Sequence, residues 1–209
     1  MKKYFSHFKD REFLISAITA IFLLVISLVI NFYAGTYATE KSSNSVTDIV
    51  LSNIRIFDVD GIFVYGAILF WVFIAFLCLF KPKTIPFTLK SVALFIVIRS
   101  IFISLTHIGP FPGSVIVSSS NLFQKVSFGG DLFFSGHTGL PFLMALVFWD
   151  NKFLRYLFVA SSVFFAIIVL LGHYHYSIDV LSAFFITYSI YKIAEFLFKK
   201  DKKFFEFKF

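Results

Sequence analysis

The stretch FLISAITAIFLLVISLVINF, residues 13–32, has 20 consecutive residues and no charged side chain. An α-helix rises ~1.5 Å per residue, so a stretch of this length spans ~30 Å, the thickness of the hydrocarbon core of a bilayer. Because a helix satisfies its backbone hydrogen bonds internally, it is one of the few structures that lipid tolerates. The stretch therefore predicts a membrane-spanning α-helix.

Five further apolar stretches follow along the chain. They cover about 62–80, 87–105, 138–149, 154–171 and 178–198. Most approach the ~20 residues that a span needs, and the fourth is short unless it begins near Leu132. We therefore predict an all-α fold, a polytopic membrane protein whose six transmembrane helices form one bundle, with residues 1–209 as a single integral membrane domain.

The composition excludes other classes of protein. Of the 209 residues 58% are hydrophobic and 33 are phenylalanine, and the mean hydropathy is +0.86. A soluble domain of this length has too little interior to bury so much apolar surface, and disordered chains are poor in aromatic residues. The single cysteine, Cys78, lies in an apolar stretch, cannot form an intramolecular disulfide and indicates no compartment.

Positive charges follow the connections between the apolar stretches in an alternating pattern. The segments rich in lysine and arginine are the N-terminus (Lys2, Lys3, Lys9, Arg11), the second connection (Lys81, Lys83, Lys90), the fourth connection (Lys152, Arg155) and the tail (Lys199, Lys200, Lys202, Lys203, Lys208). The other connections hold only Lys41, Arg55 and Lys125. Cytoplasmic loops are enriched in lysine and arginine, so both termini are predicted to be cytoplasmic. The net charge of +7 is explained by these loops, and no nucleic-acid-binding module accompanies it.

The N-terminal segment can be interpreted in two ways, and the tail has a composition of its own. The Lys2–Lys3 region, the first apolar stretch and small residues ending at Ala38 loosely resemble a cleaved signal peptide. The apolar stretch is long for that purpose, so we favour an uncleaved span. The tail mixes lysine with phenylalanine and is expected to lie along the cytoplasmic interface as an anchor.

Most side chains with catalytic chemistry fall on the external side in this topology. They are His107 after the third span, Asp131, Ser135 and His137 before the fourth, and His173, His175 and Asp179 before the sixth. Between His137 and His175 the chain descends one span and climbs another, which returns it to the same membrane face. Two distant histidines are therefore expected to meet there.

The spacing of these residues fits phosphate chemistry. His175 and Asp179 are one helical turn apart, so the carboxylate can hold the imidazole in one tautomer and leave the other nitrogen free to attack. His137 lies in Ser135-Gly136-His137 at the predicted start of a helix, where backbone N–H groups and the Ser135 hydroxyl can bind an anion. A histidine beside a bound phosphate suits a general acid that protonates a leaving oxygen.

Two motifs in this region resemble those of a known family. GDLFFSGHT (130–138) and HYHYSIDV (173–180) are similar to the signature motifs of the sphingomyelin synthase family, within the type-2 phosphatidic-acid phosphatase superfamily. RSIFISLTHIGPFPG (99–113) also looks like a family motif, and DIVLSNIRIFDVDGIFVYG (48–66) is similar more loosely. The resemblance covers about 48–198.

The resemblance implies a six-span fold, an external active site and a catalytic triad. His175 would attack phosphorus, Asp179 would orient it and His137 would act as the acid, and neither a metal nor another cofactor is implied. A phosphohistidine or headgroup-phosphohistidine would form and be resolved by water or an alcohol. Two departures stand out. Val169 replaces an arginine typical of the wider superfamily, which favours the synthase branch. Tyr174 replaces the acidic residue usual in synthases, which leaves the headgroup and the transferase activity open.

Further residues are expected to bind substrate. Ser135, Gly136, Arg99 and Asp131 are the candidates. Arg99 lies within the third span, where it either binds a lipid phosphate or pairs with a carboxylate such as Asp131. Asp131 either holds His137 or starts the fourth helix as a favourable charge.

The sequence thus predicts a lipid phosphotransferase or phosphatase, sphingomyelin-synthase-like, that acts on a phospholipid or lipid phosphate at the extracytoplasmic face of a membrane. One rival is a lipid phosphate phosphatase with water as the sole acceptor, served by the same residues. A second is a metal-dependent enzyme, because His173-x-His175 with Asp179 could bind zinc. A third is a non-enzymatic transporter, in which intramembrane charges would line the transport path. Only Arg99 lies deep enough in the membrane for that. The headgroup, the lipid backbone and the oligomeric state stay open, and no nucleic-acid partner is expected.

Overall fold

The computed structural model describes residues 10–112 and 132–204, and every regular element in them is helical. The α-helices are α2 (Arg11–Glu40), α3 (Asp60–Phe80), α4 (Ile85–Leu105), α6 (Gly136–Val147), α7 (Lys152–Leu171), α8 (Ser177–Leu197) and α9 (Lys199–Phe204). Two short 3-10 helices, η2 (Leu51–Asn53) and η3 (Pro82–Thr84), lie in connections. The prediction of an all-α fold is confirmed for the described residues.

Five of these helices are long and apolar enough to cross a membrane: α2, α3, α4 together with η3, α7 and α8. Their bounds agree with the predicted stretches to within a few residues, apart from the end of α2. That helix continues past Phe32 to Glu40 because the added turns contain no proline and bury Gly35 and Ala38. The helix α6, the predicted fourth span, has only 12 residues.

The shortness of α6 has a structural reason in the segment before it. Residues 132–135 are not helical, and Ser135 caps α6 by accepting a hydrogen bond from the Thr138 amide. Irregular backbone is tolerated at membrane depth where protein side chains satisfy it. Two carbonyls of the segment have such partners, because Phe134 O accepts from Arg99 and Leu132 O lies 2.8 Å from the His175 ring.

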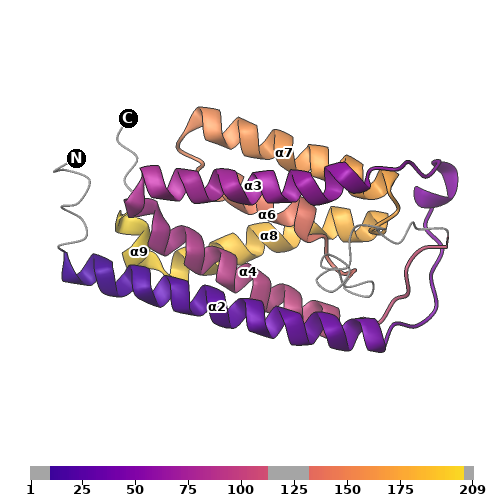
Figure 1. The fold of residues 1–209 in the computed structure, drawn as a ribbon, viewed down its shortest axis with the longest axis horizontal. Helices are drawn as coiled ribbons and strands as arrows, with labels where there is room; N and C mark the ends of the chain where they lie inside the picture. The colour runs from indigo at the N-terminus through magenta and orange to yellow at the C-terminus, as the bar shows by residue number, and fades with distance from the viewer. Residues whose placement is uncertain (1–9, 113–131, 205–209) are drawn as a thin grey trace.

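The helices form two packed groups that meet around α6 (Figure 1). The helix α2 lies along α4, α6 packs against α7 and α8, and α3 packs mainly against α7. Large side chains buried in the main core include Phe87, Phe95, Phe134, Leu143, Phe148, Phe158 and Ile190. The start of α2, the helix α9 and the α3–α4 and α6–α7 connections lie at the left-hand end in Figure 1. The lysine-rich connections of the described residues therefore share one end of the bundle.

One lysine assigned to a connection lies elsewhere. Lys90 is inside α4 and only 8% exposed, and its Nζ lies 2.7 Å from Asp201 Oδ2 of α9. Lys90 also donates to Ser16 of α2 at 2.9 Å, and the Ser16 hydroxyl donates to Asp201. The ion pair thus links α9 to α2 and α4, so the assignment of Lys90 to the connection after the second span is wrong.

Substitution of Lys90 is expected to lower stability strongly. Removing one partner of a buried ion pair leaves an uncompensated charge and costs ~3–5 kcal/mol. Lys90→Met should therefore lower the thermal unfolding temperature in detergent. The matched control is Lys192→Met, because Lys192 is exposed and pairs with Glu195 on the surface of α8. Equal unfolding temperatures for Lys90→Met and the wild type would contradict a stabilising role.

Candidate active site

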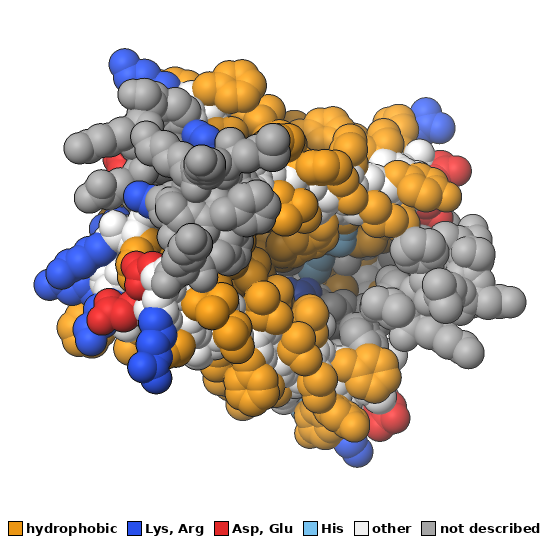
Figure 2. All heavy atoms as spheres, turned by 60° about the vertical axis from the view of Figure 1, so that its left-hand side comes forward, with side chains coloured by type: hydrophobic (Ala, Val, Ile, Leu, Met, Phe, Trp, Pro, Cys, Tyr) orange, Lys and Arg blue, Asp and Glu red, His pale blue; other side chains and the backbone are white. Residues whose placement is uncertain are grey.

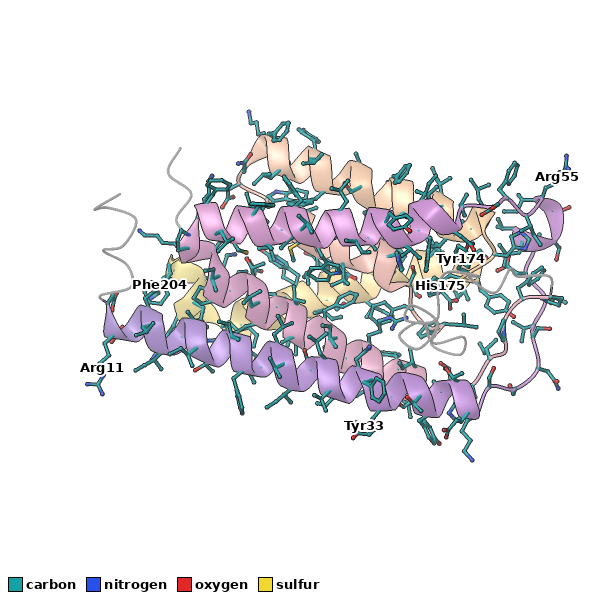
Figure 3. All side chains as sticks on the ribbon, in the orientation of Figure 1. Arg11, Tyr33, Arg55, Tyr174, His175 and Phe204 are labelled. Carbon is teal, nitrogen blue, oxygen red and sulfur yellow. The ribbon has the colours of Figure 1, made fainter. Side chains whose placement is uncertain are left out.

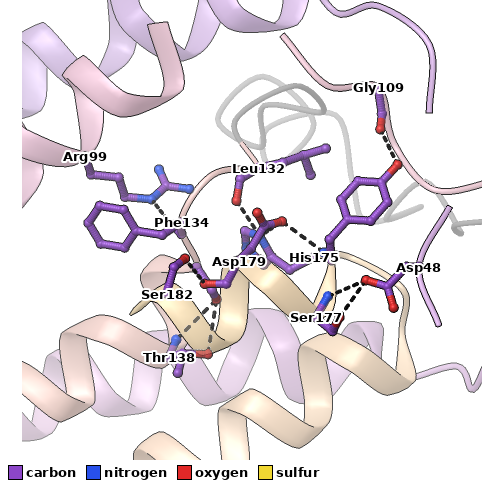
Figure 4. Close-up of polar contacts among 12 residues, drawn as sticks. Asp48, Arg99, Gly109, Leu132, Phe134, Thr138, His175, Ser177, Asp179 and Ser182 are labelled. Atoms are coloured by element: carbon purple, nitrogen blue, oxygen red, sulfur yellow. Dashed lines mark hydrogen bonds and ion pairs between the residues drawn. The ribbon is translucent and has the colours of Figure 1, made fainter. Parts of the chain in front are cut away.

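His175 is held by a backbone carbonyl and not directly by Asp179 (Figure 4). Its Nδ1 lies 2.8 Å from Leu132 O and 3.6 Å from Asp179 Oδ2. The first distance is that of a hydrogen bond and the second is too long for one. The carbonyl can only accept, so Nδ1 carries the proton and the lone pair is on Nε2. Sequence reasoning gave the orienting role to Asp179 alone, and the structure adds Leu132 O to it.

Asp179 instead stabilises the N-terminus of α8. Its Oδ2 accepts a hydrogen bond from the Tyr176 amide at 2.9 Å, and its backbone carbonyl accepts from the Ser135 amide at 3.1 Å. The residue is 1% exposed, and its Oδ1 has no hydrogen-bond partner among the described residues. Asp179 thus keeps an unused acceptor next to the imidazole while it joins α8 to the start of α6.

His137 lies close enough to both His175 and Arg99 for their charges to act on its imidazole. The Arg99 Nε donates to Phe134 O at 2.8 Å, and a Cβ placed on Gly136 would lie 3.5 Å from this nitrogen. Arg99 therefore packs against the first residue of α6. The structure brings together three of the predicted catalytic and substrate-binding side chains, from α4, α6 and the turn before α8.

Ser135 has a structural role at the start of α6. Its side chain is fully buried, and its Oγ accepts from the Thr138 amide at 3.3 Å and from the Thr138 hydroxyl at 3.2 Å. The preceding amides of α6, those of Gly136 and His137, belong to the turn that has no intrahelical acceptor. Such amides favour an anion, and the Arg99 guanidinium lies next to them.

The remaining candidates have different positions. Asp131 lies outside the described residues. His107 is half-buried, and its ring packs edge-on against Tyr37, away from the imidazole pair. His173 is buried in the α7–α8 turn with φ 55° and packs edge-on against Phe111. Burial lowers the pKa of His173, although Asp48 opposes the shift.

Two residues that sequence reasoning did not single out fix the start of α8. Asp48 Oδ2 accepts from the amide and the hydroxyl of Ser177, at 2.7 and 2.8 Å, while Oδ1 accepts from the Val50 and Leu51 amides. Burial raises the pKa of Asp48, but these hydrogen bonds outweigh it and hold the pKa below its ordinary value. Tyr176 is buried, donates to Gly109 O at 2.7 Å and accepts from the Val46 amide. In the sequence, the only signal for Asp48 was its position in the 48–66 stretch, which is loosely similar to the family.

Tyr174, the residue between the two histidines, forms a hydrogen bond with a carboxylate on another helix. Its hydroxyl donates to Asp60, the first residue of α3. Burial and this hydrogen bond raise the pKa of the Tyr174 phenol. Figure 3 shows Tyr174 and His175 toward the same end of the bundle as Arg55, opposite Arg11 and Phe204. Val169, which replaces the superfamily arginine, is fully buried among apolar side chains.

The histidine pair considered for zinc does not converge. The His175 Nδ1 is directed at Leu132 O, whereas His173 packs on Phe111. Within residues 10–112 and 132–204, no group of three or more His, Cys, Asp or Glu side chains is arranged to hold a metal ion.

One face of the molecule has a hollow between hydrophobic side chains. Figure 2 shows histidine side chains and a basic side chain at the bottom of this hollow, between rims of hydrophobic side chains. Several apolar helices around a cluster of imidazole, carboxylate and guanidinium groups are the features of an integral membrane protein with a site for phosphate chemistry.

Comparison with known proteins agrees with that class. Residues 129–196, which include His137, His175 and Asp179, match a family profile described as PAP2 superfamily C-terminal. This match supports a relationship to the PAP2 superfamily, and with it a phosphatase-type enzyme for lipid-like phosphates. No curated protein and no solved structure matched the chain.

Proposed function

We propose that this protein is a membrane enzyme that cleaves lipid phosphate esters with His175 as the nucleophile. The observation that carries the proposal is the contact of His175 Nδ1 with Leu132 O, 2.8 Å long, beside a buried carboxylate. This contact fixes the tautomer and leaves the Nε2 lone pair for attack. Arg99, on the neighbouring helix α4, supplies positive charge for a phosphate at the start of α6.

The first half-reaction breaks the bond between phosphorus and the leaving oxygen. The Nε2 of His175 forms a bond to phosphorus, and the ring becomes positively charged. Asp179 Oδ2, 3.6 Å from the ring, stabilises that charge. His137 donates a proton to the leaving oxygen, which departs as an alcohol such as diacylglycerol.

The second half-reaction releases the phosphoryl group from His175. Water or an alcohol attacks phosphorus, the bond to Nε2 breaks, and His137 takes the proton of the attacking oxygen. Transfer to an alcohol would make the enzyme sphingomyelin-synthase-like, as the two motifs imply. Transfer to water alone would make it a lipid phosphate phosphatase.

The deciding experiment uses purified protein in lipid vesicles with diacyl phospholipids and lipid phosphates as substrates. It measures free phosphate and the transfer of a headgroup to an added lipid alcohol. Release of phosphate from a lipid phosphate supports a phosphatase, and appearance of the transferred headgroup supports the synthase-like reaction. The absence of turnover on every lipid would contradict the proposal.

We propose that the site is on the extracytoplasmic side, because the end of the bundle that bears His175 is opposite the lysine-rich connections. Ser52 and Asp150 are exposed residues at the two ends. The cysteine of Ser52→Cys should react with a membrane-impermeant thiol reagent in intact cells, and that of Asp150→Cys should react only after permeabilisation. The native Cys78 is buried and gives a low background. The reverse labelling pattern would overturn this orientation.

A further inference from the structure

The His137 ring is enclosed by aromatic side chains from two other helices. Phe63 of α3 stacks on it, with ring centroids 3.9 Å apart and planes 24° apart. Phe165 of α7 approaches from another direction at 5.9 Å and 58°. Gly66 leaves room for Phe165, because a Cβ at this position would lie 3.1 Å from the phenylalanine ring. The imidazole therefore has little freedom to turn about its bond to Cβ.

Phe63 is itself packed against Tyr174, the residue before His175. The Tyr174 ring lies 4.4 Å from the Phe63 ring, and the Tyr174 hydroxyl donates to Asp60 at the start of the same helix. Gly172 allows this position of Tyr174, because a Cβ on the glycine would lie 2.4 Å from the tyrosine ring. The first turn of α3 is thus fixed to the turn that carries His175, and through Phe63 it touches His137.

Stacking on one face constrains a histidine ring in the way that a general acid requires. Proton donation needs a ring nitrogen within hydrogen-bond reach of the leaving oxygen, so the plane of the imidazole must be set before the substrate reacts. The His137 ring also donates a hydrogen bond to the backbone of Phe63. A hydrogen bond at one ring atom leaves the tilt of the ring open, and the stacked Phe63 side chain limits that tilt. Aromatic pairs in stacked geometry are favoured over random contact, which makes Phe63 a suitable support.

We propose that Phe63 is a positioning residue that holds the His137 imidazole in the plane required for proton transfer to the leaving oxygen. Phe63 lies outside residues 129–196, so the region that matches the family profile does not include it. The inference rests on the proposed function, because only a proton-donating His137 needs this support. It assigns α3 a part in catalysis although this helix supplies no reacting group.

The test compares the same variants on two substrates. One is a lipid phosphate, whose alkoxide leaving group needs a proton, and the other is a p-nitrophenyl phosphate ester, whose leaving group does not. Misplacement of a catalytic group by ~1 Å can cost ~10²-fold in rate. Phe63→Leu should therefore slow the first half-reaction, followed as the pre-steady-state burst of leaving group, ~10–10²-fold on the lipid and much less on the activated ester, with KM nearly unchanged. Phe63→Trp keeps an aromatic face and should recover most of the lipid activity.

The matched control is Phe76→Leu, the same substitution on the same helix. Phe76 is exposed and lies ~20 Å along α3 from Phe63, so both activities should stay near the wild-type values. Thermal unfolding of all variants in detergent separates a loss of folding from a loss of catalysis.

The outcomes separate this inference from the proposed function. Equal proportional losses of Phe63→Leu on the two substrates, or no loss, would overturn the positioning role and leave Phe63 as a packing residue. Inactive wild-type protein would overturn the proposed function itself. If His137→Ala fails to discriminate between the substrates, the acid role falls and the role of Phe63 falls with it.

Discussion

His175→Ala is expected to abolish turnover on every substrate while the protein stays folded in detergent. The residue is 6% exposed, and the one hydrogen bond of its side chain among the described residues goes to the Leu132 carbonyl. Alanine removes the nitrogen that we propose as the nucleophile, and no leaving group compensates for a missing nucleophile. The measurement is the initial rate with a lipid phosphate and with a p-nitrophenyl phosphate ester.

The matched control for this variant is His107→Ala. His107 is also a histidine at the same end of the bundle, but it packs on Tyr37 and not on the site. The control should retain activity. A rapid alkaline quench with radiolabelled substrate should also trap a phosphohistidine in the wild type and none in His175→Ala. Wild-type rates in correctly folded His175→Ala would exclude the nucleophilic role.

His137→Ala should discriminate between substrates, which His175→Ala should not. A general acid is typically worth ~10²–10⁴-fold, and its benefit depends on how strongly the leaving group needs a proton. A diacylglycerol alkoxide needs one, whereas p-nitrophenolate leaves without it. In the first half-reaction, followed as the burst of released leaving group, the variant should therefore lose ~10²-fold or more on a lipid phosphate and distinctly less on the activated ester.

The contrast is measured as a ratio, because His137 also lies beside Arg99 and a bound phosphate would touch both. Loss of phosphate binding lowers both activities by the same factor and cancels in the ratio of the two rates. The ratio for His137→Ala is compared with that for His175→Ala and the wild type, with unfolding temperatures as the check on folding. A wild-type ratio would show that His137 binds phosphate and does not donate the proton.

Much of the fold was predictable because membrane insertion depends on local composition. The ends of α3, α4, α7 and α8 fall within a few residues of the apolar stretches. The prediction was less successful where tertiary contacts override composition. The end of α2 extends because Gly35 and Ala38 pack inside the bundle, and Lys90 is buried because Asp201, 111 residues away, neutralises it. The six-helix count stays a prediction, because α6 alone is shorter than a full span.

The candidate site was predictable in its residue types and not in its geometry. His137, His175 and Asp179 could be selected because imidazole and carboxylate groups are rare in apolar sequence and their spacing returns them to one face. Asp48 and Tyr176 escaped selection, because their partners, Ser177 and Gly109, are more than 60 residues away from them in the chain. Phe63 escaped it for a different reason: among 33 phenylalanines, composition does not distinguish the one that stacks on a histidine.

The sequence by itself predicted an apolar helical bundle with four of its five histidines on one membrane face. Hydropathy and the positions of charged residues suffice for that, because each span inserts according to its own ~20 residues. Only the tertiary structure decided which atom orients His175. That atom is a backbone oxygen of Leu132, which is present in every residue and has no signature in the sequence. The carbonyl can accept a hydrogen bond from the imidazole because residues 132–135 are not helical, so it is not engaged in a hydrogen bond within a helix.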